Sequence, residues 1–204
     1  ALCAVRTSRI GLGPAVLVPN LRHVLVTASA IAHLESLAAG RTAYAIGTGF
    51  TARMALGQRP LPWQYVIDYV TQLKALLRGE TVEVDGTRIA MIHGDGQAPA
   101  RPLNPPFIIA ATGPKGQALA REHGDGVFGV SPVPGFDFSA ALTFGTILDP
   151  GASADSERVL AAAGPAGAVA FHAIYESNPD AVLGLPGGAE WKAAIEQYPA
   201  DVRH

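Results

Sequence analysis

The chain has 204 residues, of which 49% are hydrophobic and 16% charged, so it can bury a sizeable core and is too poor in charge to be disordered. A formal net charge of −2 gives no electrostatic basis for binding nucleic acid or an anionic membrane surface. The single cysteine, Cys3, excludes an internal disulfide, and no other Cys or His stands at metal-ligand spacing from it.

Short apolar runs alternate along the chain with longer stretches of helical spacing. This alternation predicts strand-helix-strand units around a parallel sheet that is buried on both faces. We expect strands at residues 10–18, 42–46, 106–111, 126–130 and 141–148. We expect helices at residues 23–39, 63–78 and 117–123, and a buried helix in the uncharged run 159–175, which is shorter than the roughly 20 residues of a membrane span.

Residues 81–92 break the alternation of strands and helices. Apolar and polar residues alternate there around Asp85-Gly86, which predicts a hairpin rather than a crossover helix. Four prolines between residues 98 and 106 predict an extended surface connection after it.

Three predicted strands end in residues that could hold a ligand. The run 112–116, Thr-Gly-Pro-Lys-Gly, joins a strand to a helix whose free N–H groups attract an anion, although an ordinary turn explains the same residues. The run 45–50 contains Gly-x-Gly without the third glycine of a dinucleotide fingerprint. The third end, 13–20, precedes Arg22 and His23, which are equally consistent with a helix start.

Other catalytic motifs are missing from the sequence. The histidines do not cluster, and there is no Gly-x-Ser-x-Gly elbow, Walker loop or Cys-x-x-Cys. The residues therefore give hydrolase, kinase and metalloenzyme hypotheses no support, and we expect no metal site.

Three segments, in this order and at these separations, resemble the bacterial luciferase-like superfamily of flavin- and F420-dependent oxidoreductases. They are RTSRIGLGPAVLVPNLRH at 6–23, LESLAAGRTAYAIGTG at 34–49, and IAATGPK at 109–115 followed by GDGV at 124–127. The resemblance extends over nearly the whole chain and is weakest after about residue 132.

The resemblance implies an α/β fold, a (β/α)8 TIM barrel with an insertion between its fourth and fifth strands. The predicted hairpin and proline-rich connection, at about 79–105, match that insertion within a single domain over residues 1–204. Counted against the family, the chain begins in the second helix, so the barrel is expected to be incomplete at the N-terminus. Whether the eighth strand is also missing at the C-terminus stays open.

The resemblance also implies the position of a cofactor, FMN or coenzyme F420. The ring would pack on a bulged strand end with a non-proline cis peptide bond between Ala15 and Val16 or at an immediate neighbour. The cofactor-binding residues implied are Ala15, Val16, Phe50, Arg53, Thr112, Gly113, Pro114 and Lys115, the last four at the phosphate. Some F420-dependent members have an acid in place of Phe50 and an asparagine near Arg53, and many have proline in place of Val24.

The activity implied is that of an FMN- or F420-dependent oxidoreductase, a monooxygenase or reductase that transfers hydride on a small organic substrate. We expect a cytoplasmic homo-oligomer with no nucleic-acid or membrane partner, and we assign no catalytic residue. One alternative is a non-catalytic flavin-binding relative or truncated remnant of the same fold. Another is a barrel enzyme that acts on a phosphorylated metabolite without flavin.

Overall fold

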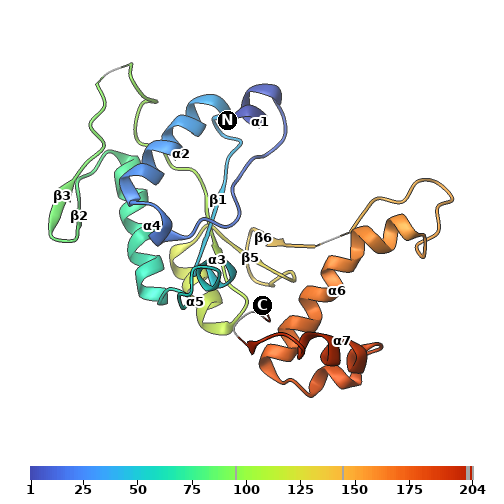
Figure 1. Ribbon diagram of the computed structural model, residues 1–204. Helices are drawn as coiled ribbons and strands as arrows, with labels where there is room; N and C mark the ends of the chain where they lie inside the picture. The colour runs from blue at the N-terminus through green and yellow to red at the C-terminus, as the bar shows by residue number, and fades with distance from the viewer. Residues whose placement is uncertain (95, 144, 201–202, 204) are drawn as a thin grey trace. The chain divides into compact units, whose positions relative to one another are not determined.

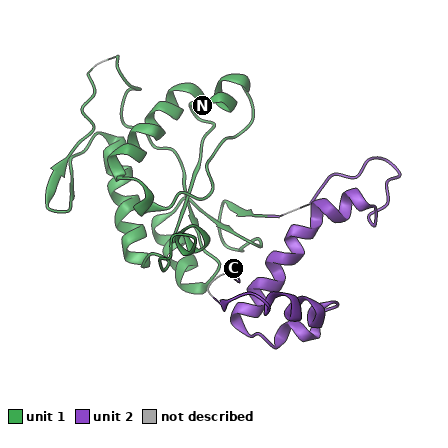
Figure 2. Cartoon of the chain, viewed as in Figure 1, with its two compact units in different colours: residues 1–142 green, residues 143–204 purple. Residues whose placement is uncertain are grey.

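The computed structural model describes residues 1–94, 96–143, 145–200 and 203. It comprises two compact units, residues 1–142 and residues 143–204 (Figure 2). The first unit contains the sheets and the second is built from helices and loops (Figure 1). The organisation of residues 1–204 as a single domain remains a prediction.

Four short strands form the centre of the first unit. They are β1 (Tyr44–Gly47), β4 (Phe107–Ala110), β5 (Gly126–Gly129) and β6 (Ser139–Ala141), paired in parallel in the order β1-β4-β5-β6. All of β1 is buried, as expected for a parallel strand covered on both faces. Over the described residues the sheet is open, which agrees with the prediction of an incomplete barrel.

The last predicted strand, residues 141–148, is wrong apart from Ala141, where β6 ends. The amide of Leu142 still donates to the carbonyl of Gly129 at 2.8 Å, but β5 ends at Gly129 and offers no further partner. Ile147 is accordingly 91% exposed. Residue 144 lies outside the described residues. Hydrogen bonding to β5 therefore determines where this strand ends, and the apolar composition of residues 141–148 does not.

The first predicted strand, residues 10–18, runs beside β1 but pairs there at two points only, Leu12 with Thr42 and Leu17 with Ile46. The two leucines are five positions apart whereas their partners are four apart, so one extra residue is inserted as a bulge. Pro14 contributes to the interruption because it has no N–H; its carbonyl accepts from Ala45 at 3.1 Å.

The peptide bond between Ala15 and Val16 is cis, which confirms the prediction for this strand end. A second cis bond precedes Pro102.

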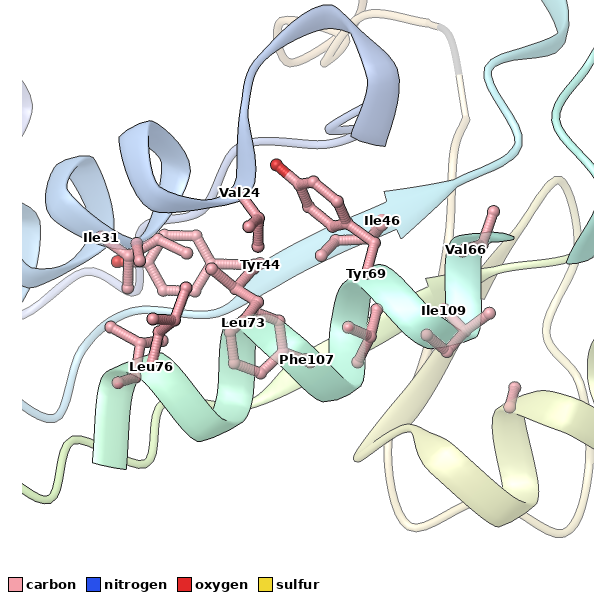
Figure 3. Packing of buried hydrophobic residues seen from close by; sticks show 14 of the residues in the cluster. Val24, Ile31, Tyr44, Ile46, Val66, Tyr69, Leu73, Leu76, Phe107 and Ile109 are labelled. Carbon is pink, nitrogen blue, oxygen red and sulfur yellow. The ribbon is translucent and has the colours of Figure 1, made fainter. Parts of the chain in front are cut away.

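Two long helices cover the sheet, and both agree with the sequence. They are α2 (Val24–Ala38) and α4 (Trp63–Arg78), and the latter stops at Gly79, whose φ of 91° is in the left-handed region that favours glycine. Side chains of α4 such as Leu73 pack with Tyr44 and Phe107 in the core (Figure 3). The shorter helices of this unit are α1 (Leu2–Arg6), the 3₁₀ turn η1 (Pro19–Leu21), α3 (Phe50–Met54) and α5 (Pro114–His123).

A buried carboxylate joins α2 to the start of β1. Glu35 of α2 is 8% exposed, and the same oxygen, Oε1, accepts hydrogen bonds from the hydroxyl of Tyr44 at 3.0 Å and from the hydroxyl of Thr42. Burial raises the pKa of the Tyr44 phenol above its ordinary value, with the Glu35 charge acting in the same direction.

The predicted hairpin is present as β2 (Val82–Val84) and β3 (Thr87–Ile89), an antiparallel pair. Asp85 and Gly86 both have positive φ, 49° and 74°, as a two-residue turn that matches the strand twist requires. The hairpin forms a sheet of its own, apart from the four-stranded sheet, and lies between β1 and β4 in the chain (Figure 1). The assignment of residues 79–105 as an insertion in the barrel remains a prediction.

The second unit contains α6 (Glu157–Ser177), the 3₁₀ turn η2 (Ala181–Gly184) and α7 (Gly188–Ile195). The run 159–175 is helical as predicted, but none of the residues of α6 is buried, so its assignment as a buried helix is wrong. Few residues of this unit cover the helix; Trp191 of α7 contacts His172, with ring centroids 4.9 Å apart. By length and composition alone, α6 is long and apolar enough to cross a membrane.

Candidate functional site

The candidate site is a pocket of about 620 Å³ at the carboxyl ends of the parallel strands, within the size range of small-molecule and cofactor sites. Its walls come from the end of the segment 10–18, the ends of β1, β4 and β5, and the first residues of α3, α4 and α5. The lining residues are Val16, Val18, Gly47–Ala52, Trp63, Ala110–Gly116, Phe128–Val130 and Leu142.

The bulged segment supplies the first wall. Val16 is 38% exposed, and its Cγ1 atom would lie 3.1 Å from a Cβ placed on Gly47. Gly47 ends β1, and the same Cβ would come within 2.9 Å of the Ala110 side chain on the neighbouring strand. Glycine at this position therefore leaves room for Val16 and Ala110 on both sides of the strand end.

The loop after β1 supplies the second wall. Gly49 has a φ of 77° and precedes α3, which places Phe50 on the pocket with half of its side chain exposed. Arg53 is one turn further along α3 and does not line the pocket. Its Nε donates to the carbonyl of Arg59 and so ties α3 to the following loop.

The third wall is the turn from β4 into α5. Gly113 is the residue before the helix, Pro114 is the first helical residue, and the amide of Gln117 is already bonded to the Gly113 carbonyl at 3.0 Å. No side chain caps the helix and no acid occupies its first turn. The N–H groups of Lys115 and Gly116 precede the first intrahelical bond, so this end can attract an anion.

The charge distribution of the pocket is simple. Among the described residues that line it, Lys115 is the one with a charged side chain, and the remaining polar side chains are threonines and the indole of Trp63. The site thus combines largely apolar walls with one cationic group beside a helix N-terminus. This arrangement suits a flat apolar ring that carries an anionic tail.

The pocket brings together six of the eight residues predicted from the sequence. They are Val16, Phe50, Thr112, Gly113, Pro114 and Lys115; Ala15 and Arg53 do not line it. Their binding role remains a prediction. Sequence reasoning missed Trp63, Phe128 and Leu142. The end of the predicted strand 126–130 could have indicated Phe128 by the strand-end rule, whereas Trp63 at a helix start and Leu142 inside a predicted strand carried no such indication.

Two other sequence motifs have structural roles. His23 precedes α2, and its Nδ1 atom accepts from the amide of Leu25 at 3.2 Å, so it caps that helix. Asp125, from the GDGV motif, accepts from the amide of Phe107 at 2.8 Å and lies 3.1 Å from the Lys74 ammonium. Asp125 thereby joins the start of β4 to α4, at the opposite end of β4 from the pocket.

Comparison with known sequences identifies relatives that match part of the chain. The chain is 38% identical over 136 residues to the F420-dependent glucose-6-phosphate dehydrogenase of Beutenbergia cavernae, covering 60% of this chain and 38% of that protein. It is 31% identical over 129 residues to the 5,10-methylenetetrahydromethanopterin reductase of Methanolobus tindarius, covering 61% and 38%. The chain therefore matches less than half the length of these curated relatives.

Among solved structures, the F420-dependent tetrahydromethanopterin reductase of Methanopyrus kandleri superposes with a TM-score of 0.64 at 21% identity, over 99% of this chain and 71% of that one. At this identity the similarity shows the fold, the luciferase-like TIM barrel. The model of the family described as luciferase-like monooxygenase matches residues 1–143. The chain belongs to the luciferase-like monooxygenase family.

Proposed function

We propose that this protein is an F420-dependent oxidoreductase that holds its cofactor in the pocket at the strand ends. The observation that carries the proposal is the pocket itself, whose largely apolar walls end at the uncapped N-terminus of α5 beside Lys115. The relatives in sequence support F420, since they include an F420-dependent glucose-6-phosphate dehydrogenase. The substrate would be a small organic molecule.

The residues would divide the binding task between the ring and its tail. Val16 and Phe50 would contact the two sides of the ring. Phe128, near the end of β5, would close the pocket beside it. The amides of Lys115 and Gly116 and the hydroxyl of Thr112 would donate to the phosphate, and the Lys115 ammonium would add charge at the rim.

When bound, F420 supplies the hydride-transfer chemistry of such an enzyme. The chain would contribute orientation and exclusion of water, because its apolar walls surround a site with few polar groups. Among the described lining residues none is a carboxylate or a histidine, so a general acid or base would have to come from the substrate or from outside the pocket lining.

FMN is the second candidate cofactor, because it joins an apolar ring to a phosphate in the same way and none of the described lining residues is an acid that would disfavour it. The absence of an acid or base from the described lining also favours the alternative of a non-catalytic flavin-binding protein. A flavin-free enzyme acting on a phosphorylated metabolite would bind the phosphate at the N-terminus of α5 and would have no need of the apolar walls.

Absorbance and fluorescence titrations with F420, with FMN and with a sugar phosphate test these possibilities. Saturable binding of F420, followed by hydride transfer between the bound cofactor and the substrate in either direction, is the expected result. Saturable FMN binding without F420 binding would change the cofactor. Binding of either one without turnover would indicate the non-catalytic alternative, and binding of the sugar phosphate alone would contradict the proposal.

A further inference from the structure

Trp63 contacts the helix end that the proposed function assigns to the phosphate. A Cβ placed on Gly116 would lie 2.4 Å from Cζ2 and 2.8 Å from Cη2 of the indole, and 2.7 Å from the Cβ of Ala111. These distances are too short for any real carbon pair, so the outer edge of the Trp63 ring and the Ala111 methyl group together occupy the space in which another residue would carry its side chain. Gly116 is buried, whereas Trp63 keeps part of its surface on the pocket.

The indole is attached to a helix with a deeply buried face. Trp63 is the first residue of α4, whose side chains Val66, Val70 and Leu73 are at most 1% exposed. Just before it, the amide of Leu61 donates to the carbonyl of Thr48 at 2.9 Å, which fixes the approach to α4 against the end of β1. The backbone of Trp63 therefore lies between two anchored segments.

The contact falls on the turn of α5 whose N–H groups have no intrahelical acceptor. Gly116 is the third residue of α5, and its amide and that of Lys115 precede the first intrahelical bond from Gln117. A shift of this turn by a fraction of an ångström would change the direction of both amides, and hydrogen bonds weaken steeply as they lose alignment. The contact between the indole and Gly116 therefore lies on the turn that carries both of these amides.

We propose that Trp63 is a positioning residue for the cofactor phosphate, which acts by setting the position of the first turn of α5 through its contact with Gly116. The inference rests on the proposed function, because it assigns the α5 end to the phosphate. It goes beyond that function because it makes the packing of the Trp63 indole against Gly116 a determinant of cofactor affinity.

A double-mutant cycle tests the proposal. Gly116→Ala should push the turn away from the indole, and Trp63→Phe should remove Cζ2 and Cη2 and leave the turn unsupported. Each change should weaken F420 binding, and FMN binding if FMN is the cofactor, about tenfold, the loss expected for an impaired hydrogen bond to a charged group. In the double variant the alanine methyl no longer meets the indole, but it still meets the Ala111 Cβ at 2.7 Å, so affinity should recover in part. The combined loss should be clearly smaller than the roughly hundredfold product of the two single losses.

Gly164→Ala is the matched control, because Gly164 also lies in a helix and a Cβ there meets nothing within 4 Å. Its cofactor affinity should equal that of wild type.

Additive losses in the double variant, or unchanged affinity in Trp63→Phe, would overturn the inference while leaving the proposed function intact. Failure of wild type to bind either cofactor would contradict the proposed function and, with it, the inference. If Gly116→Ala does not fold, Trp63→Phe alone decides the outcome.

Discussion

At Gly113 a substitution should affect cofactor binding without affecting folding. Its φ of −94° is accessible to any residue, and a Cβ placed on it meets nothing within 4 Å. The fold therefore does not require glycine here, whereas a phosphate approaching the turn would.

We predict that Gly113→Val lowers cofactor affinity at least tenfold, because the side chain fills the approach to the amides of α5. The melting temperature without cofactor should stay unchanged. Gly145→Val is the control, since Gly145 is equally unobstructed and lies outside the pocket lining. Fluorescence titration measures the affinity, and equal values for Gly113→Val and wild type would remove the phosphate from this turn.

The hydrogen bond from Tyr44 to the buried Glu35 gives a stability prediction. Tyr44→Phe removes one of two hydroxyl donors to the carboxylate and should cost about 1.5–3 kcal/mol of unfolding free energy, the usual range for hydrogen bonds to charged groups. Urea denaturation measures the change. Tyr65→Phe, at a tyrosine that is 47% exposed, should leave stability unaltered. A loss below about 0.5 kcal/mol for Tyr44→Phe would show that Thr42 alone satisfies the carboxylate.

Tyr69 gives a prediction of pH dependence. Burial raises the pKa of its phenol, and the hydrogen bond with Thr27 at 2.6 Å lowers it by less. A folded-state pKa above the unfolded value of about 10 means that the contribution to stability is complete below that pH and is lost as pH rises through the folded pKa. Tyr69→Phe should therefore make unfolding free energy fall less steeply above about pH 10. An unchanged alkaline slope would contradict the assignment.

At the scale of elements, the segment 10–18 depends on a close approach to the residues before β1. A Cβ placed on Gly13 would lie 2.1 Å from the carbonyl oxygen of Ala43, so any side chain there would force the two segments apart. Gly11, two positions earlier, would place its Cβ 3.9 Å from the Arg41 carbonyl, an ordinary contact. The two glycines thus have different roles in one segment.

We predict that Gly13→Ala destabilises the protein by about 1–3 kcal/mol, in the range of overpacking substitutions, and that Gly11→Ala changes stability by much less. Because Val16 follows in the same segment, Gly13→Ala should also weaken cofactor binding. Thermal unfolding and cofactor titration measure both effects. Equal stability of the two variants would mean that the segment does not need its close contact with residues 41–43.

At the scale of the whole molecule, the open sheet bears on association. Among the described residues β6 pairs with β5 alone, and the exposed side chain of Phe138 precedes it. Unpaired strand edges invite pairing with another chain. We predict that the protein forms homo-oligomers, measured as a concentration-dependent sedimentation coefficient. A single monomeric species over the whole concentration range would contradict this prediction.

Local patterns in the sequence determined much of the fold by themselves. The spacing of apolar residues identified α2 and α4, because a helix that covers a sheet must repeat its buried face every three to four residues. Asp85-Gly86 identified the hairpin because its turn needs positive φ at both residues. The family resemblance predicted the bulge, the cis bond at Ala15 and the turn 112–115 at the pocket.

Tertiary structure alone decided the remaining features, since they depend on partners distant in sequence. The apolar run 141–148 could not reveal that β5 offers hydrogen-bonding partners only as far as Gly129. The apolar composition of residues 159–175 could not reveal that little of its unit covers α6. Trp63 joined the pocket because α4 and α5 meet where Gly116 has no side chain, a contact between residues 53 positions apart that no local pattern contains.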